Sequence, residues 1–283
     1  MAIPIINNWE QYFFNPDEGL GSSYERIIIN NKLLQIAKLF NIKSVLEAPS
    51  FGFTGISGIN SFALKQNSIN VHLLDHNRSR IKLIKKTWQD LKENVDIDFT
   101  TDYMELSYPD KQFNLVWNFS ALWFVDDLQI FLEEFTRICN KVVLICVPNQ
   151  TGLGFLSQKY SGKKEMEKIN IDNIAPSKII KIMRSLNWTL LQQNYIDCPP
   201  WPDIGMPKEK FLRQFGLSKL ISDKPKESIS ILDYYSMKNM QFPEQMMKYS
   251  WFERIAPDFI KQFWAHHKYL LFIPNPRKQK QRN

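Results

Sequence analysis

Three acidic residues stand at or shortly after the points where short apolar runs of the sequence end. Glu47 closes the run 43–47, Asp75 closes the run 69–75, and Asp102 follows the run 96–99. A carboxylate accepts hydrogen bonds from both hydroxyls of a ribose, so an acid at the end of a second strand is typical of nucleotide-binding sites. The plainer interpretation is that Glu47 and Asp75 only cap the helices that follow them.

A loop with three glycines follows the first of these runs. Residues 45–60 read VLEAPSFGFTGISGIN, with glycines at 52, 55 and 58. Glycine permits positive φ and close approach of the backbone to a ligand, as a cofactor loop requires. Pro49 removes one N–H donor, and the phosphate-binding patterns GxGxxG and GxxxxGK[ST] do not occur here. The loop therefore disfavours an NAD-linked oxidoreductase, which stays the least favoured alternative.

Alternating apolar and amphipathic segments predict the elements that position these residues. Such alternation indicates an α/β protein with a doubly wound sheet, in which ligands bind beyond the carboxyl ends of the strands. We expect helices at 19–40, 58–66, 78–92, 126–140 and 177–186. Strands are expected at 43–47, 69–75, 96–99, from 113 onwards, at 141–149, 188–196 and 268–274.

The segment from 102 to 116 resembles the class I S-adenosylmethionine-dependent methyltransferases, especially the small-molecule methyltransferases of type 11. The matching residues are Asp102, Tyr103, Tyr108, Pro109, Asp110, Phe113, Leu115 and Val116. Asn114 stands where this family usually has Asp, and Pro49 replaces the first glycine of its loop. The resemblance implies a Rossmann-like, mostly parallel seven-stranded sheet, an antiparallel last strand, and S-adenosylmethionine as the cofactor.

The same resemblance implies roles for side chains at the expected edge of the sheet. Glu47 would reach the methionine end of the cofactor and Asp75 would hold the ribose. Asp102 would accept from the adenine amino group, with Tyr103 beside the ring. Further contacts with the cofactor are expected from Ala48, Pro49, Gly52, Gly55, His76, Asn118 and Tyr24.

The chain divides into a core with additions at both ends. We expect an N-terminal helical cap at 1–40, a cofactor-binding core at 41–196, an α-helical insertion at 197–265, the last strand at 266–275, and a basic tail at 276–283. An antiparallel last strand starts at the edge where the preceding strand ends, so the insertion is placed as a lid. Its methionines and aromatic residues suit a small, largely apolar substrate, with Trp201 and Asp203 as contacts. Ordinary helical packing, or a homodimer interface, are the alternatives.

The predicted reaction is transfer of a methyl group from S-adenosylmethionine to such a molecule. In-line displacement depends mainly on positioning and on exclusion of water. His266 and His267 are candidates for a general base, although an exposed pair that ends the lid is the favoured interpretation. Without a clear base, a non-catalytic binding module of the same fold remains the main alternative.

Composition and charge limit the binding partners and the cellular location that the sequence predicts. The net charge is +7, and four positive charges lie in the tail PNPRKQKQRN, which we interpret as a solvated end that binds no nucleic acid. No apolar run reaches transmembrane length, and the start MAIPIINNWEQYFF does not have the pattern of a secretory signal. The three cysteines share no metal-like spacing, so the sequence predicts a cytoplasmic protein with no metal site and no membrane insertion.

Overall fold

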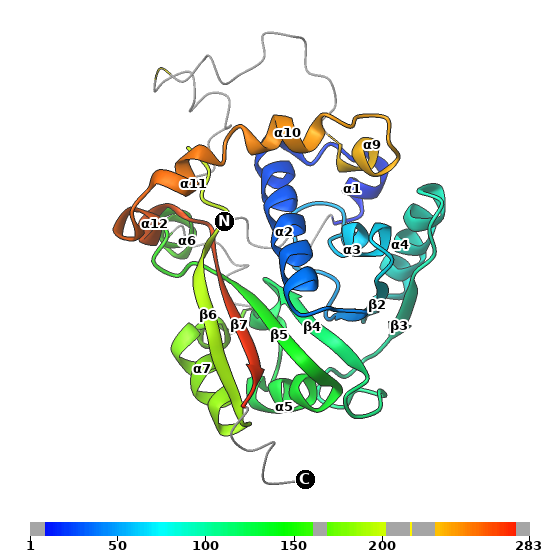
Figure 1. Cartoon of the computed structure of the whole chain (residues 1–283), viewed down its shortest axis with the longest axis vertical. Helices are drawn as coiled ribbons and strands as arrows, with labels where there is room; N and C mark the ends of the chain where they lie inside the picture. The colour runs from blue at the N-terminus through cyan, green and yellow to red at the C-terminus, as the bar shows by residue number, and fades with distance from the viewer. Residues whose placement is uncertain (1–8, 161–168, 202–215, 217–229, 276–283) are drawn as a thin grey trace.

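A computed structural model describes residues 9–160, 169–201, 216 and 230–275 (Figure 1). Seven strands form one sheet: β1 (Ser44–Glu47), β2 (Asn70–Asp75), β3 (Asp96–Phe99), β4 (Phe113–Phe119), β5 (Cys139–Pro148), β6 (Trp188–Ile196) and β7 (His267–Pro274). The longer helices are α2 (Gly19–Leu39), α4 (Arg78–Asp90), α5 (Leu128–Ile138) and α7 (Pro176–Ser185). Shorter helices are α1 (Gln11–Phe14), α3 (Phe62–Gln66), α6 (Leu153–Lys159), α9 (Ile231–Tyr235), α10 (Phe242–Met247), α11 (Trp251–Ile255) and α12 (Asp258–Trp264), with 3-10 turns η1 (Leu122–Phe124) and η3 (Ile171–Ile174).

The strands lie in the order β3-β2-β1-β4-β5-β7-β6. β7 pairs antiparallel with both β5 and β6, and the other pairs are parallel. The order reverses between β1 and β4, which is the switch point where ligands bind in open α/β sheets. The predicted fold class is confirmed: a doubly wound, mostly parallel seven-stranded sheet of the methyltransferase type.

Neighbouring residues along the central strands β1 and β4 are buried on opposite faces of the sheet. Val45 and Leu115 belong to a core shared with α2, α3, α4 and α10, whereas Leu46 and Val116 belong to a core shared with α5 and α7. Both cores are densely aromatic and fully enclosed. Burial on both faces explains why the central strands read as continuous apolar runs.

The predicted start differs from the observed start by two residues or more at two helices, each for a local reason. The helix expected at 58–66 begins only at Phe62, because Gly52, Gly55 and Gly58 adopt positive φ and keep the preceding residues in a loop. The helix expected from 126 begins at Leu128, because the Asp127 side chain accepts from the backbone N–H groups of the first turn.

Within the insertion predicted at 197–265, the described residues include the helices α9, α10, α11 and α12. Asp203, much of the expected lid and the tail at 276–283 lie outside the described residues. The division of the chain into cap, core, lid and tail therefore stays a prediction. Within the described ranges, no helix is long and apolar enough to cross a membrane.

Candidate active site

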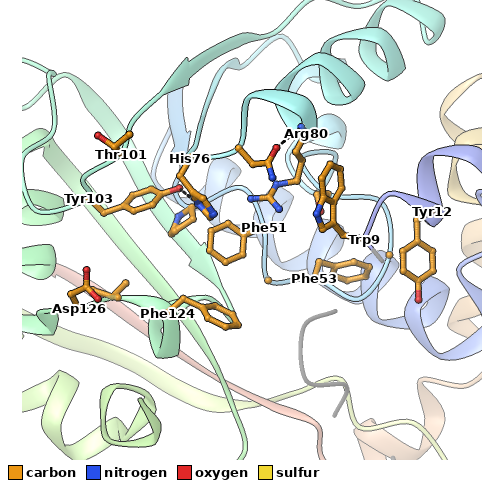
Figure 2. Close-up of a pocket in the computed structure, with 16 residues that line it drawn as sticks. Trp9, Tyr12, Phe51, Phe53, His76, Arg80, Thr101, Tyr103, Phe124 and Asp126 are labelled. Carbon is orange, nitrogen blue, oxygen red and sulfur yellow. Dashed lines mark hydrogen bonds between the residues drawn. The ribbon is translucent and has the colours of Figure 1, made fainter. Parts of the chain in front are cut away.

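A cavity of about 530 Å³ opens beyond the carboxyl ends of the strands around the switch point (Figure 2). Its described walls come from the loop after β1, the start of α4, the residues after β3, the residues after β4, and the N-terminal segment. The lining residues are Trp9, Tyr12, Pro49, Phe51, Gly52, Phe53, Gly55, Ser57, His76, Asn77, Arg80, Thr101, Tyr103, Phe124, Val125 and Asp126. Its position and size are those of a small-molecule site in an open α/β sheet.

Glycine is required at two points of the loop after β1. A Cβ on Gly52, whose φ is +120°, would lie 2.2 Å from the carbonyl oxygen of Phe119. A Cβ on Gly55, whose φ is +152°, would lie 2.5 Å from a carboxylate oxygen of Glu18. The loop can therefore lie directly on the end of β4, and its backbone forms one wall of the cavity.

Aromatic rings line the part of the cavity next to β2 and β3. His76 and Tyr103 share a hydrogen bond of 3.2 Å, and the Phe51 ring lies edge-on to His76 at 4.8 Å. Phe51 also contacts Phe124 at 5.4 Å, so rings from four segments, one after each of β1, β2, β3 and β4, surround one space (Figure 2). Burial lowers the pKa of His76 and raises the pKa of Tyr103, so both rings are held in their neutral forms at neutral pH. Neutral, flat side chains suit a planar heterocycle.

Asp75, the expected ribose ligand, is engaged within the protein instead. Its Oδ1 accepts from Arg80 Nη2 at 2.7 Å and from the Asn77 backbone N–H at 2.8 Å. Its Oδ2 accepts from Arg80 Nε at 2.8 Å and from Ser50 Oγ at 2.6 Å. Asp75 is fully buried and is not among the residues that line the cavity, whereas Arg80 is.

Glu47, the expected ligand of the methionine end, is also buried and directed into the protein. Its two oxygens accept from Asn60 Nδ2 at 3.0 Å and from Ser61 Oγ at 2.7 Å. Burial raises the pKa of Glu47 to about 7, although these hydrogen bonds and the charge of Arg26 act in the opposite direction. The side chain is therefore partly protonated at neutral pH and does not line the cavity.

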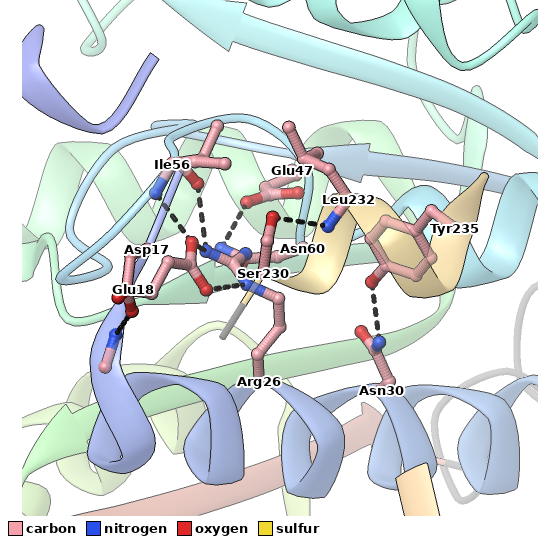
Figure 3. A network of polar contacts seen from close by, with 11 residues as sticks. Asp17, Glu18, Arg26, Asn30, Glu47, Ile56, Asn60, Ser230, Leu232 and Tyr235 are labelled. Carbon is pink, nitrogen blue, oxygen red and sulfur yellow. Dashed lines mark hydrogen bonds and ion pairs between the residues drawn. The ribbon is translucent and has the colours of Figure 1, made fainter. Parts of the chain in front are cut away.

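A buried ion pair supports the same loop from the side of α2 (Figure 3). Arg26 pairs with Glu18, donates to Asn60 Oδ1 at 2.6 Å and to the Ile56 carbonyl at 3.1 Å, and lies over the Phe53 ring. Glu18 Oε1 also accepts from the Ile56 backbone N–H. The network connects the N-terminal helix to the loop and, through Asn60, to Glu47.

The other expected cofactor contacts have structural partners of their own. Asn118 is buried, donates to the Ala48 carbonyl and accepts from the Ala121 N–H, so it ties the end of β4 to the loop after β1. Asp102 is exposed and accepts from the Met104 N–H at 2.6 Å. Tyr24 is buried and donates to a carboxylate oxygen of Glu253 at 3.2 Å.

The expected substrate contact and the two histidines lie away from the cavity walls. Trp201 is fully buried and packs edge-on against Tyr24 and Tyr249. The interpretation of His266 and His267 as an exposed pair is wrong, because their side chains are 9% and 5% exposed. His266 Nδ1 lies 2.6 Å from Asp197 Oδ2, at the edge of the sheet where β6 ends and β7 begins.

Among the expected contacts, Pro49, Gly52, Gly55, His76 and Tyr103 line the cavity. The sequence reasoning missed Trp9 and Tyr12, which precede the first long helix, and Arg80, one turn into the helix after β2. It also missed Asp126, which lies between η1 and α5. Of the other missed residues, Phe51, Phe53, Asn77 and Thr101 are next to expected residues in the sequence, whereas Ser57, Phe124 and Val125 are not.

Part of the chain matches the model of a known domain family. Residues 53–146 match the model of a methyltransferase domain family, Methyltransf_11, and this range includes most of the loop after β1 and strands β2 to β4. No curated protein sequence matches the chain.

Solved structures share the fold at low sequence identity. A proposed sarcosine dimethylglycine methyltransferase from Galdieria sulphuraria is 10% identical over 87% of this chain and 85% of its own, with a TM-score of 0.53. A proposed methyltransferase from Bacillus halodurans is 16% identical over 87% and 98%, with a TM-score of 0.51. The YcgJ protein of Bacillus subtilis is 12% identical over 87% and 97%, with a TM-score of 0.50. The family match over residues 53–146 agrees with the pattern at 102–116, and the similar solved structures show a shared fold.

Proposed function

We propose that the protein is an S-adenosylmethionine-dependent methyltransferase that acts on a small, largely apolar molecule. The observation that carries the proposal is the cavity at the switch point, walled by the backbone of the Gly52–Gly55 loop and by neutral rings. Its volume of about 530 Å³ lies in the range of small-molecule sites, about 300–1,000 Å³.

The lining residues fit a nucleoside-sized cofactor. His76, Tyr103 and Phe51 offer flat apolar surfaces for a base, and Thr101, Asn77 and Asp126 offer polar groups in the same walls. When bound, S-adenosylmethionine would supply an activated methyl group on a sulfonium. The protein's part is to hold the acceptor in line with that methyl and to exclude water.

Aromatic side chains from the N-terminal segment and the loop after β1 support an apolar acceptor. Trp9, Tyr12 and Phe53 line the cavity there, and Phe124 lines it beside Phe51. In the described residues, these walls carry only Asp126 and Arg80 as charged side chains, and Arg80 is paired with Asp75. Burial of the acceptor's apolar surface in this cavity would contribute about 25 cal/mol per Å² to the free energy of binding.

One observation favours the alternative of a non-catalytic binding module. The two acids expected to bind the cofactor, Glu47 and Asp75, have their oxygens engaged by Asn60, Ser61 and Arg80. Because these oxygens are bonded within the protein, Glu47 and Asp75 do not offer the two contacts with S-adenosylmethionine that the resemblance implies. The cytoplasmic location, the exclusion of nucleic acid and the homodimer also remain predictions.

Calorimetric titration with S-adenosylhomocysteine, with NAD as the control ligand, tests the proposal. We expect micromolar binding of S-adenosylhomocysteine and none of NAD. Tyr103→Ala should weaken binding at least tenfold, or about 1.4 kcal/mol, because Tyr103 lines the cavity. Tyr108→Ala is the matched control, since Tyr108 lies five positions away, bonds to Asp98 and does not line this cavity. No binding of S-adenosylhomocysteine would reject the enzyme and leave the binding module.

A further inference from the structure

Three ligand-type side chains from distant parts of the chain converge beyond the ends of β6 and β7. Glu25 lies on α2, Asp197 follows the last residue of β6, and His267 is the first residue of β7. One nitrogen or oxygen atom from each side chain lies within 4.8 Å of the other two. Figure 1 shows β6 and β7 side by side, and this cluster connects them to the long N-terminal helix.

The cluster is buried, and its polar atoms do not satisfy one another. Glu25, Asp197 and His267 are 7%, 1% and 4% exposed. In the described part of the chain, Glu25 Oε1, Asp197 Oδ1 and His267 Nδ1 are buried without a hydrogen-bond partner. Glu25 Oε1 lies 2.7 Å from His267 Nδ1 as an ion pair. Buried polar groups left in this way are rare and require a cause.

In the described residues, the two carboxylates of the cluster face only imidazoles as ion-pair partners. His267 Nδ1 lies 2.7 Å from Glu25 Oε1, and His266 Nδ1 lies 2.6 Å from Asp197 Oδ2. Among the residues that the structure describes, neither Glu25 nor Asp197 forms an ion pair with a lysine or arginine. Buried charge that is not compensated is costly, and a cation would remove this cost.

The donor set and its surroundings are those of a metal centre. Two carboxylate oxygens and one imidazole nitrogen are ligands that zinc accepts, and three protein ligands leave a coordination position open. The second oxygen of Asp197 is held at 2.6 Å by His266 Nδ1. Such an outer partner fixes the direction of a ligating carboxylate.

We propose that Glu25, Asp197 and His267 bind a divalent first-row transition metal ion, for which zinc is the probe. The ion would fasten α2 to the ends of β6 and β7. The His267 ring packs at 4.6 Å on Phe119, and Phe119 packs at 5.7 Å on Phe53, which lines the cavity. The metal centre is therefore separate from the cavity and adjacent to it.

The test is a titration of the untagged, full-length protein with zinc chloride after removal of metals with a chelator. We expect one equivalent of zinc per chain and a rise in the unfolding temperature. Asp197→Asn and Glu25→Gln keep the side-chain shape and should each weaken zinc binding about a hundredfold. Glu253→Gln is the matched control, because Glu253 is a half-buried carboxylate that accepts from Tyr24 and the Cys198 N–H instead. Uptake well below one equivalent, or unchanged affinity in both ligand variants, would overturn the proposal.

A measurement on the unaltered protein covers the case in which the variants do not fold. Cobalt(II) bound by a nitrogen and two oxygen ligands at an open tetrahedral site gives a visible absorption band that zinc should abolish by competition. The appearance of this band at one equivalent supports the site, and its absence rejects it. Neither measurement depends on S-adenosylmethionine, so failure of the metal site and failure of the proposed function are distinguishable.

Discussion

Asp75 and Arg80 form a two-pronged ion pair in which Oδ1 lies 2.7 Å from Nη2 and Oδ2 lies 2.8 Å from Nε. Both side chains are buried, and the pair joins the end of β2 to the first turns of α4. The wall of the cavity next to β2 therefore presents a guanidinium group rather than a carboxylate. Any ribose bound here would meet Arg80, Asn77 and Thr101 before it met Asp75.

Removal of Asp75 tests how much this ion pair supports the fold. Asp75→Ala leaves Arg80 as a buried charge without its partner, which should lower the free energy of unfolding by about 3–5 kcal/mol. Chemical denaturation measures the change. The control is Asp110→Ala, which removes an ion pair with Arg137 at 2.9 Å in which the Asp110 side chain is 74% exposed. An exposed pair contributes about 1 kcal/mol or less, so equal losses in the two variants would contradict the assignment.

Glu47 should make the stability of the protein depend on pH. Burial raises its pKa from 4.5 to about 7, so the folded protein binds this proton more tightly than the unfolded chain does. The stabilisation is fully present below pH 4.5 and is lost as the pH rises toward 7, a change on the order of 3 kcal/mol.

The comparison with Glu47→Gln isolates this effect. The variant cannot titrate, so it should gain stability relative to the unaltered protein between about pH 4.5 and 7. Denaturation curves at a series of pH values measure the difference. Glu105→Gln, at an exposed position, provides the control. Curves for the unaltered protein and Glu47→Gln that stay parallel over this range would show that Glu47 is not responsible.

Gly52 should tolerate no side chain. In Gly52→Ala the new Cβ would lie 2.2 Å from the Phe119 carbonyl at a φ of +120°, so backbone strain and a clash with β4 act together. We expect a loss of about 2–4 kcal/mol. Gly19→Ala is the control, since Gly19 also has positive φ, +71°, but no atom within 4 Å of the new Cβ. Gly19→Ala should lower the free energy of unfolding by about 1–2 kcal/mol. A loss of the same size for Gly52→Ala would show that the contact with the Phe119 carbonyl adds nothing.

The backbone of this protein was easier to predict than the direction of its side chains. Apolar runs located each core strand within about two residues, because burial on both faces leaves little choice of residue. The positions of Glu47 and Asp75 at strand ends followed from the same pattern. Their orientation did not, since it depends on Ser61, Asn60 and Arg80, whose hydrogen bonds form only after the following helices pack.

Local sequence patterns did not predict which side chains from distant segments come into contact. The predicted lid geometry placed Asp197, His266 and His267 at one edge of the sheet, but it did not bring Glu25 to them. Glu25 reads as part of an ordinary first helical turn, and Asp197 as the end of a strand. Only the antiparallel insertion of β7 next to β6 brings the three ligand-type side chains together.

The position of β7 also determines when the sheet can be completed during synthesis. β7 is the last strand in the sequence, yet it lies between β5 and β6. Until residues 267–274 have left the ribosome, the edge of β5 is unpaired and β6 has no neighbour in the sheet. Unpaired edges promote association between chains, and nascent domains are exposed to this risk while they wait for distant partners. A nascent chain halted before residue 267 should therefore aggregate or recruit chaperones far more than one that has passed residue 274.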